Sequence, residues 1–147
     1  MCPGFMRPYL LSIVFGAIAS AAAAAILAYG AAITAGALNH PLESWAWFFL
    51  ASVGPCTLLP PVILRMRKEM EFKGADVFCA ALLGFFAVAL SGSLGAVLVE
   101  SARRGLTHVN VSGYMDWSFI YALVLLPISL PLAMLVLRYP WQIMTKK

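Results

Sequence analysis

Charged side chains are scarce in this sequence: only 11% of its 147 residues are Asp, Glu, Lys or Arg, whereas 63% are hydrophobic. A soluble domain carries about 25% charged and about 45–50% apolar residues, so this chain lacks the polar groups that a water-exposed surface needs. The composition therefore predicts an integral membrane protein. The net charge of +4 is then expected to meet anionic lipid head groups rather than nucleic acid.

Patterns for disulfides and metal binding are also missing. Cys2, Cys56 and Cys79 lie far apart and form no Cys-x-x-Cys pair, which argues against a disulfide framework or a metal site. His40 and His108 both lie outside the long apolar segments, so neither is placed to hold a haem between helices. We therefore expect no cofactor and no bound metal.

The long apolar segments contain no ionisable residue near their centres. Only Asp76 and Glu100 come close, at the two ends of the third segment. Because ionisable groups inside a membrane mark proton and ion pathways, their absence counts against ion-coupled transport. The chain also has no His-Glu-x-x-His motif and no Gly-rich phosphate loop, so we expect a non-catalytic protein.

What the chain does contain is four apolar segments, over residues 9–38, 45–64, 75–99 and 118–137. About 20 apolar residues are enough to cross a bilayer as a helix. The sequence therefore predicts one all-α domain, residues 1–147, of four transmembrane helices in two antiparallel hairpins. The first segment is too long for a cleaved secretory signal, so a retained signal-anchor is favoured.

The basic residues predict an orientation. A basic loop covers residues 65–73, between the second and third segments, and residues 100–117 form the longest loop on the other side. Lys and Arg are retained in cytoplasmic loops, so both termini are expected in the cytoplasm of a bacterial inner membrane, with only Arg103 and Arg104 outside. Contact with lipid or an acidic partner is expected from four residues of the basic loop. These are Arg65, Arg67, Lys68 and Lys73.

Prolines and small residues recur within the segments. Each proline removes a backbone donor, and kinks are predicted in the second and fourth helices. The prolines concerned are Pro55, Pro60, Pro61, Pro127 and Pro131. The carbonyl groups freed in the second helix are expected to be satisfied by neighbouring helices or by Ser52 and Thr57.

Small residues recur every four positions along the first and third segments, forming two stripes that favour close helix packing. The stripes consist of Gly16, Ser20 and Ala24, and of Ala80, Gly84, Gly92 and Ala96.

The two halves of the chain share one spacing. Trp45 precedes Pro55 by ten residues, and Trp117 precedes Pro127 by the same ten. A parallel internal repeat would produce this spacing. Chance recurrence is the favoured interpretation, because apolar spans draw on few residue types.

Three functions fit these features. The favoured one is an accessory or assembly subunit that binds other membrane subunits, or its own copies, through a small-residue stripe. The alternative is a small oligomeric transporter or channel for a neutral or lipid-like solute, lined by the kinked helices. The third is a membrane enzyme that uses polar residues at the outer side, where no spacing sets a nucleophile against a base. Its candidate residues are His40, Arg103, Arg104, His108 and Asp116.

Overall fold

The computed structural model describes residues 3–35 and 41–146, and within these ranges the chain is helical apart from short turns, with no strand. The elements are α1 (Pro3–Ala35), α2 (Pro41–Glu69), α3 (Ala75–Leu90), the π-helical turn η1 (Ser91–Gly95), α4 (Ala96–Arg104), the 3-10 turn η2 (Leu106–His108), α5 (Val111–Val124) and α6 (Leu126–Thr145). The predicted all-α class is confirmed.

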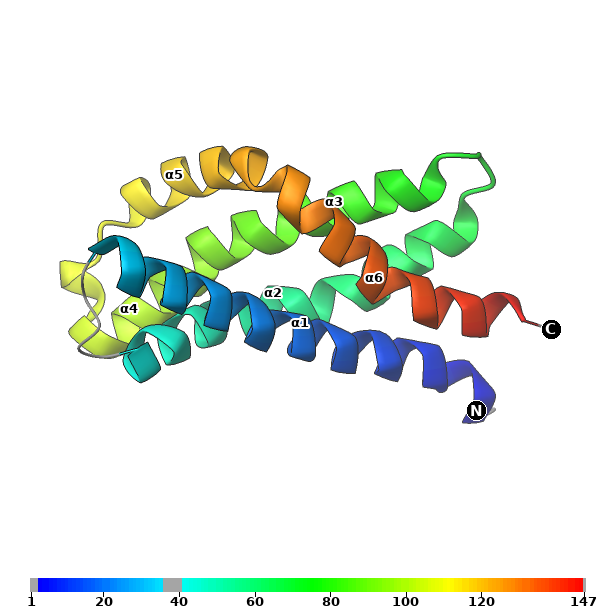
Figure 1. Ribbon diagram of the computed structural model, residues 1–147, viewed down its shortest axis with the longest axis horizontal. Coiled ribbons are helices and arrows are strands. Elements are labelled where there is room, and N and C mark those ends of the chain that lie inside the picture. The colour runs from blue at the N-terminus through cyan, green and yellow to red at the C-terminus, as the bar shows by residue number, and fades with distance from the viewer. Residues whose placement is uncertain (1–2, 36–40, 147) are drawn as a thin grey trace.

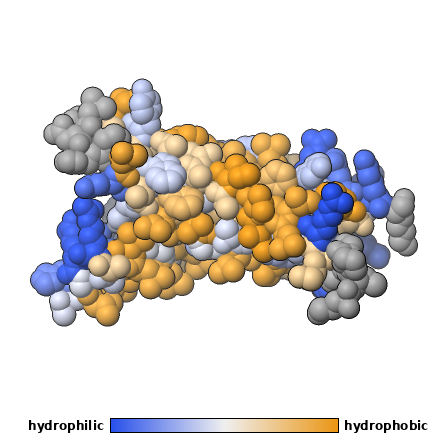
Figure 2. Space-filling view, turned by 90° about the horizontal axis from the view of Figure 1, so that it is seen from below, coloured by the Kyte–Doolittle hydropathy of each residue, from blue (hydrophilic) through white to orange (hydrophobic). Residues whose placement is uncertain are grey.

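Within the described ranges, three helical stretches are long and apolar enough to cross a membrane: Met6–Gly30, Leu42–Glu69 and Ala75–Arg104, the last joining α3, η1 and α4. Helices α5 and α6 pass the same test only together, and they are bent by 77°, so a fourth span exists only if this pair counts as one. Figure 2 shows a broad hydrophobic band with hydrophilic residues at both ends. A lipid bilayer fits such a surface.

The helices run along the long axis of the molecule (Figure 1). Both described chain ends lie beside the α2–α3 turn, which we call the basic end; α4 and the start of α5 lie at the opposite end. Helix α2 is central, because it contacts α1, α3, η1, α4 and α6. Within the described chain, α5 contacts α3 and η1 but not α1.

Most of the loop expected over residues 100–117 is helical. Helix α4 continues to Arg104 and ends at Gly105, whose φ of +82° few other residues adopt. Helix α5 then begins at Val111, because the Asn110 side chain accepts a hydrogen bond from the backbone N–H of Gly113. Only residues 105–110 connect the two helices.

The fourth apolar segment is broken rather than kinked within a single helix. The bend of 77° lies between α5 and α6, at Leu125. Pro127 explains this position, because it cannot donate to the carbonyl of Leu123 and its ring clashes with that carbonyl. Pro131 lies within α6. In contrast, α2 is continuous through Pro55, Pro60 and Pro61, so the two halves differ where the repeat hypothesis aligns them.

Two glycines lie against the carbonyl groups that the α2 prolines leave without a donor. Pro55 and Pro60 release the carbonyls of Ala51 and Cys56, four residues earlier. A Cβ built on Gly95 would lie 1.9 Å from the Ala51 oxygen, and one built on Gly16 would lie 1.8 Å from the Cys56 oxygen. Only glycine allows this approach, and its Cα–H can donate weakly to the oxygen.

Of the two sources expected for these carbonyls, neighbouring helices lie against them, whereas Ser52 and Thr57 bond elsewhere. Ser52 Oγ donates to the Phe48 oxygen at 2.8 Å, and Thr57 Oγ1 donates to the Val53 oxygen at 2.7 Å. The carbonyls of Phe48 and Val53 already accept the regular helical hydrogen bonds from the backbone N–H groups four residues later, so neither is one of the carbonyls that the prolines free. The carbonyls of Ala51 and Cys56 are therefore covered from η1 and α1, whereas Pro61 also removes the donor to the Thr57 carbonyl.

The sequence did not predict the π-helical turn η1. Its wider turn leaves backbone carbonyls less well paired, and two serine hydroxyl groups donate to carbonyls one turn earlier. Ser91 Oγ bonds the Ala87 oxygen at 2.5 Å, and Ser93 Oγ bonds the Ala89 oxygen at 2.7 Å. This turn carries Gly95 to its position against α2.

The glycine contacts generate a stability prediction. Gly16→Ala should lower the free energy of unfolding by about 1–3 kcal/mol, because the new methyl group must push α1 away from α2. Gly30→Ala is the matched control in the same helix, since a Cβ there meets nothing within 4 Å. It should leave stability unchanged or raise it by up to about 1 kcal/mol. Thermal unfolding in detergent measures both, and equal midpoints would contradict the close contact.

Candidate functional site

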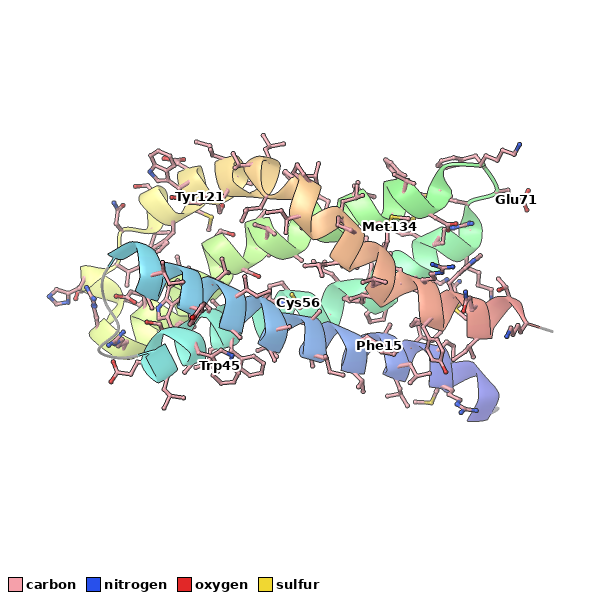
Figure 3. The ribbon with its side chains drawn as sticks, in the orientation of Figure 1. Phe15, Trp45, Cys56, Glu71, Tyr121 and Met134 are labelled. Carbon is pink, nitrogen blue, oxygen red and sulfur yellow. The ribbon has the colours of Figure 1, made fainter. Side chains whose placement is uncertain are left out.

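A cavity of about 480 Å³ lies inside the helix bundle. Its wall comes from α1, α2, α3, η1, α5 and α6, and none of its lining residues is charged. Small residues such as Ala19, Ala23 and Ala87 form much of the wall, and its aromatic residues are Trp47, Phe48 and Tyr121. Figure 3 shows Cys56, which also lines the cavity, near the middle of α2. The volume is within the range of about 300–1,000 Å³ that small-molecule sites occupy.

The serine hydroxyl groups of the wall are bound to protein atoms. Ser52 Oγ lies 2.6 Å from Ser20 Oγ and also donates to the Phe48 carbonyl. Ser91 bonds within its own helical turn, and Ser129 Oγ donates to the Leu126 oxygen at 3.4 Å. None of these serines is paired with a histidine or a carboxylate, so the wall supplies no activated nucleophile. The cavity therefore suits an apolar ligand.

A packed core closes the cavity toward the basic end. Leu83, Ala133 and Val136 belong both to the cavity wall and to a cluster of buried side chains. From there the cluster continues through Leu64 and Cys79, both fully buried. Close-packed side chains of this kind leave no passage for a solute. The cavity is therefore closed at this end rather than continuous through the molecule.

Arg67 fastens the basic end. Its guanidinium forms an ion pair with Asp76, donates to the Met70 carbonyl at 2.8 Å, and lies 4.3 Å from the centroid of the Trp141 ring. These contacts join α2, the α2–α3 turn, α3 and α6, and the side chain is only 18% exposed. The Arg67 guanidinium therefore contacts groups of its own chain and stabilises the packing of these elements. Arg65, by comparison, pairs with Glu69 on the surface, and Lys73 is exposed.

The cavity is only partly enclosed, and α1 and α5 are two of the helices around it. Both helices contribute to the wall, yet within the described chain they do not contact each other. Leu27 on α1 and Tyr121 on α5 line the cavity and are 45% and 54% exposed. The bend at Leu125 explains the gap, because it directs α5 away from α1 whereas α6 packs on it (Figure 1).

A second hollow of about 370 Å³, which we call the vestibule, lies at the opposite end. It is lined by Glu43, Ser44, Trp47, Phe48 and Arg103. Trp47 and Phe48 also line the cavity, so the two spaces share this aromatic wall.

Glu100 holds one part of this wall in place. Its carboxylate accepts a hydrogen bond from Trp47 Nε1 at 3.1 Å and forms an ion pair with Arg104 Nε at 2.6 Å. The sequence places Glu100 at the end of the third apolar segment but does not connect it with Trp47. No spacing in the sequence links residues 47 and 100.

Both predicted small-residue stripes face other helices of the same chain. Gly16 approaches Cys56, Ser20 bonds Ser52, and Ala24 is buried. On the second stripe, Gly84 lies against Ser129 and Gly92 against Ser118. Ala80 and Ala96 are buried as well. Neither stripe presents its small residues to a second protein.

The residues considered for an enzyme do not converge. Arg104 binds Glu100, Arg103 pairs with Glu43 at 3.5 Å, and both His108 and Asp116 are exposed. His40 lies outside the described residues. Among the described residues, no three His, Cys, Asp or Glu side chains form a cluster that could hold a metal ion.

Comparison of the chain with protein-family models, with curated proteins and with solved structures finds no match. The cavity is therefore interpreted from its own geometry. It is a partly enclosed apolar chamber with a packed core on the side of the basic end.

The role of Arg67 is testable by comparison with Arg65. Arg67→Ala should lower the free energy of unfolding by about 1–3 kcal/mol, because it removes an ion pair, a hydrogen bond and a cation–π contact together. Arg65→Ala removes an exposed ion pair with Glu69 and an interaction with Tyr9, and it should cost much less, because solvent screens exposed charges. Unfolding in detergent measures both variants. Equal losses would show that Arg67 does not fasten this end.

Proposed function

We propose that this chain is a small, non-catalytic integral membrane protein that binds a lipid-like molecule, with an apolar chain of the ligand inside the central cavity. The observation that carries the proposal is an uncharged wall to which α1 and α5 both contribute without packing closely on each other, and from it we infer a lateral opening between these two helices. An opening at that position would face the hydrocarbon of the bilayer, where lipid-like molecules are the available ligands.

The same geometry favours one version of the transporter hypothesis over the others. An ion needs charged or carbonyl ligands along its route, but the wall has no charged residue and its serine hydroxyl groups are bound to protein. A channel needs a continuous pore, whereas the buried cluster lies beyond the cavity toward the basic end. A lipid-like solute entering from the side needs neither.

The accessory-subunit hypothesis stays a prediction, but a partner subunit would have to bind a surface other than the small-residue stripes. Its original support was a small-residue stripe left free for a partner helix. Both stripes pack inside the chain, so a partner would have to bind the larger lipid-facing side chains instead. A stable complex with one other membrane protein would favour that function over lipid binding.

We further propose that α5 and α6 together make the fourth crossing, with both termini in the cytoplasm of a bacterial inner membrane. The support is the distribution of basic residues: apart from Arg103 and Arg104, the described ones belong to the basic end or to the terminal regions beside it. Cytoplasmic retention of Lys and Arg supports this orientation.

Filling the cavity tests the binding proposal. Ala23→Phe places a ring in the cavity wall, so the purified variant should retain less co-purifying lipid than the wild-type protein. Ala22→Phe is the matched control, because the neighbouring side chain is exposed and lies outside the wall. Native mass spectrometry counts the retained lipids. Equal lipid retention by a folded Ala23→Phe variant and the control would overturn the proposal.

The proposed orientation has its own test. A fluorescent protein that matures only in the cytoplasm, fused after Lys147, should fluoresce in bacterial cells. Alkaline phosphatase, which folds only outside, should be inactive at the same position but active when inserted between Thr107 and His108. The reverse pattern would show that the basic end faces outward.

A further inference from the structure

We propose that the vestibule binds the polar head group of the same ligand, and that this head group is zwitterionic, with a phosphate and a cationic amine. This inference rests on the proposed function, because it assigns the other half of an amphiphilic molecule whose apolar chain occupies the cavity. It names the ligand class as a net-neutral phospholipid.

The shared wall of the two spaces is the first argument. Trp47 and Phe48 line both, so the spaces are adjacent, and a single ligand would place its chain on one side of these two rings and its head group on the other. The cavity lining is uncharged, whereas three of the five vestibule residues carry polar groups at their ends. The lining thus changes from apolar to polar across Trp47 and Phe48. An amphiphilic ligand changes in the same way between its apolar chain and its polar head group.

Charge is the second argument, and it decides the class of head group. The vestibule has one cation, Arg103, and one anion, Glu43. A phosphate matches the guanidinium, which can donate two parallel hydrogen bonds to it. An amine matches the carboxylate. An anionic head group without an amine would satisfy Arg103 but would lie beside Glu43 and be repelled by it.

The existing contact between these two residues is loose enough to be replaced. Arg103 Nη2 lies 3.5 Å from Glu43 Oε2, and the side chains are 55% and 64% exposed. An exposed pair at this distance contributes little free energy. Arg104 differs, because its Nε lies 2.6 Å from the nearly buried carboxylate of Glu100. Arg103 is therefore the vestibule cation that a phosphate can recruit without breaking the contact that holds Trp47.

The neighbouring pair explains why the vestibule keeps its shape. Glu100 is only 8% exposed and binds both Trp47 and Arg104, so its charge is neutralised by protein groups. The indole of Trp47 is fixed by this bond and can serve as the rigid divider between head group and chain. Ser44 adds a hydroxyl group to the vestibule wall.

The test measures head-group preference with the acyl chains held constant. Delipidated full-length protein in detergent is titrated with phosphatidylethanolamine and phosphatidylglycerol of identical chains, and bound lipid is quantified by native mass spectrometry. The wild-type protein should prefer phosphatidylethanolamine by about fivefold, which corresponds to one partly desolvated charge contact. Glu43→Gln should abolish or reverse this preference, because it leaves Arg103 without the competing carboxylate. Arg103→Gln should weaken binding of both lipids.

The matched control is Glu69→Gln, which removes the carboxylate of an equally exposed ion pair with Arg65 at the other end of the molecule. It should leave the preference unchanged. A wild-type protein that binds both lipids equally, or a Glu43→Gln variant that keeps the wild-type ratio, would overturn the proposal.

The Ala23→Phe variant separates this failure from failure of the proposed function. If Ala23→Phe lowers binding but Glu43→Gln leaves the ratio unchanged, the cavity binds a lipid chain and the vestibule does not select its head group. If Ala23→Phe binds both lipids as the wild-type protein does, the cavity is not the binding site and both proposals fail.

Discussion

The contact between proline-freed carbonyls and glycines is the constraint on which this bundle depends. In hydrocarbon, an unsatisfied backbone carbonyl costs several kcal/mol, and α2 contains prolines that create such groups in its middle. Gly95 of η1 lies against the Ala51 oxygen, and Gly16 of α1 lies against the Cys56 oxygen. Each Cα–H···O contact contributes only about 0.5–1 kcal/mol, but it also replaces lipid at an exposed polar atom. Helix α2 therefore requires a glycine-bearing helix on each of two sides, which makes it the centre of the fold.

The cavity follows from the same arrangement. Contacts of α1 and η1 with α2 use glycine and alanine, so the helices meet where their side chains are smallest and little bulk remains to fill the interior. The bend of 77° then separates α5 from α1 while α6 stays in contact with it. In water, an empty apolar space of this size would destabilise the fold. In a bilayer, a space that opens to the side can be filled by a hydrocarbon chain, which restores the missing dispersion contacts.

The two ends of the molecule treat their charges differently. At the basic end, Arg67 is held by three partners from the α2–α3 turn, α3 and α6, and a packed core lies behind it. At the opposite end, only the Glu100–Arg104 pair is partly buried, whereas Glu43 and Arg103 stay exposed and loosely paired beside a hollow. The first end stabilises the bundle. The second has charges that are free to exchange partners, which is why a head-group site is assigned there.

The sequence by itself determined the chemical class of the molecule: scarcity of charge and long apolar segments are properties of composition, and they predict membrane helices whatever the packing. It also located the prolines and the small residues, because helical periodicity places Gly16, Ser20 and Ala24 on one face. It did not reveal that both stripes pack inside the chain, that Pro127 breaks the fourth segment while Pro55 leaves α2 continuous, or that Trp47 meets Glu100. These depend on which helix lies opposite each residue. A proline removes the same backbone donor everywhere, but whether the helix continues is decided by the neighbour that covers the freed carbonyl, and only the tertiary structure supplies that neighbour.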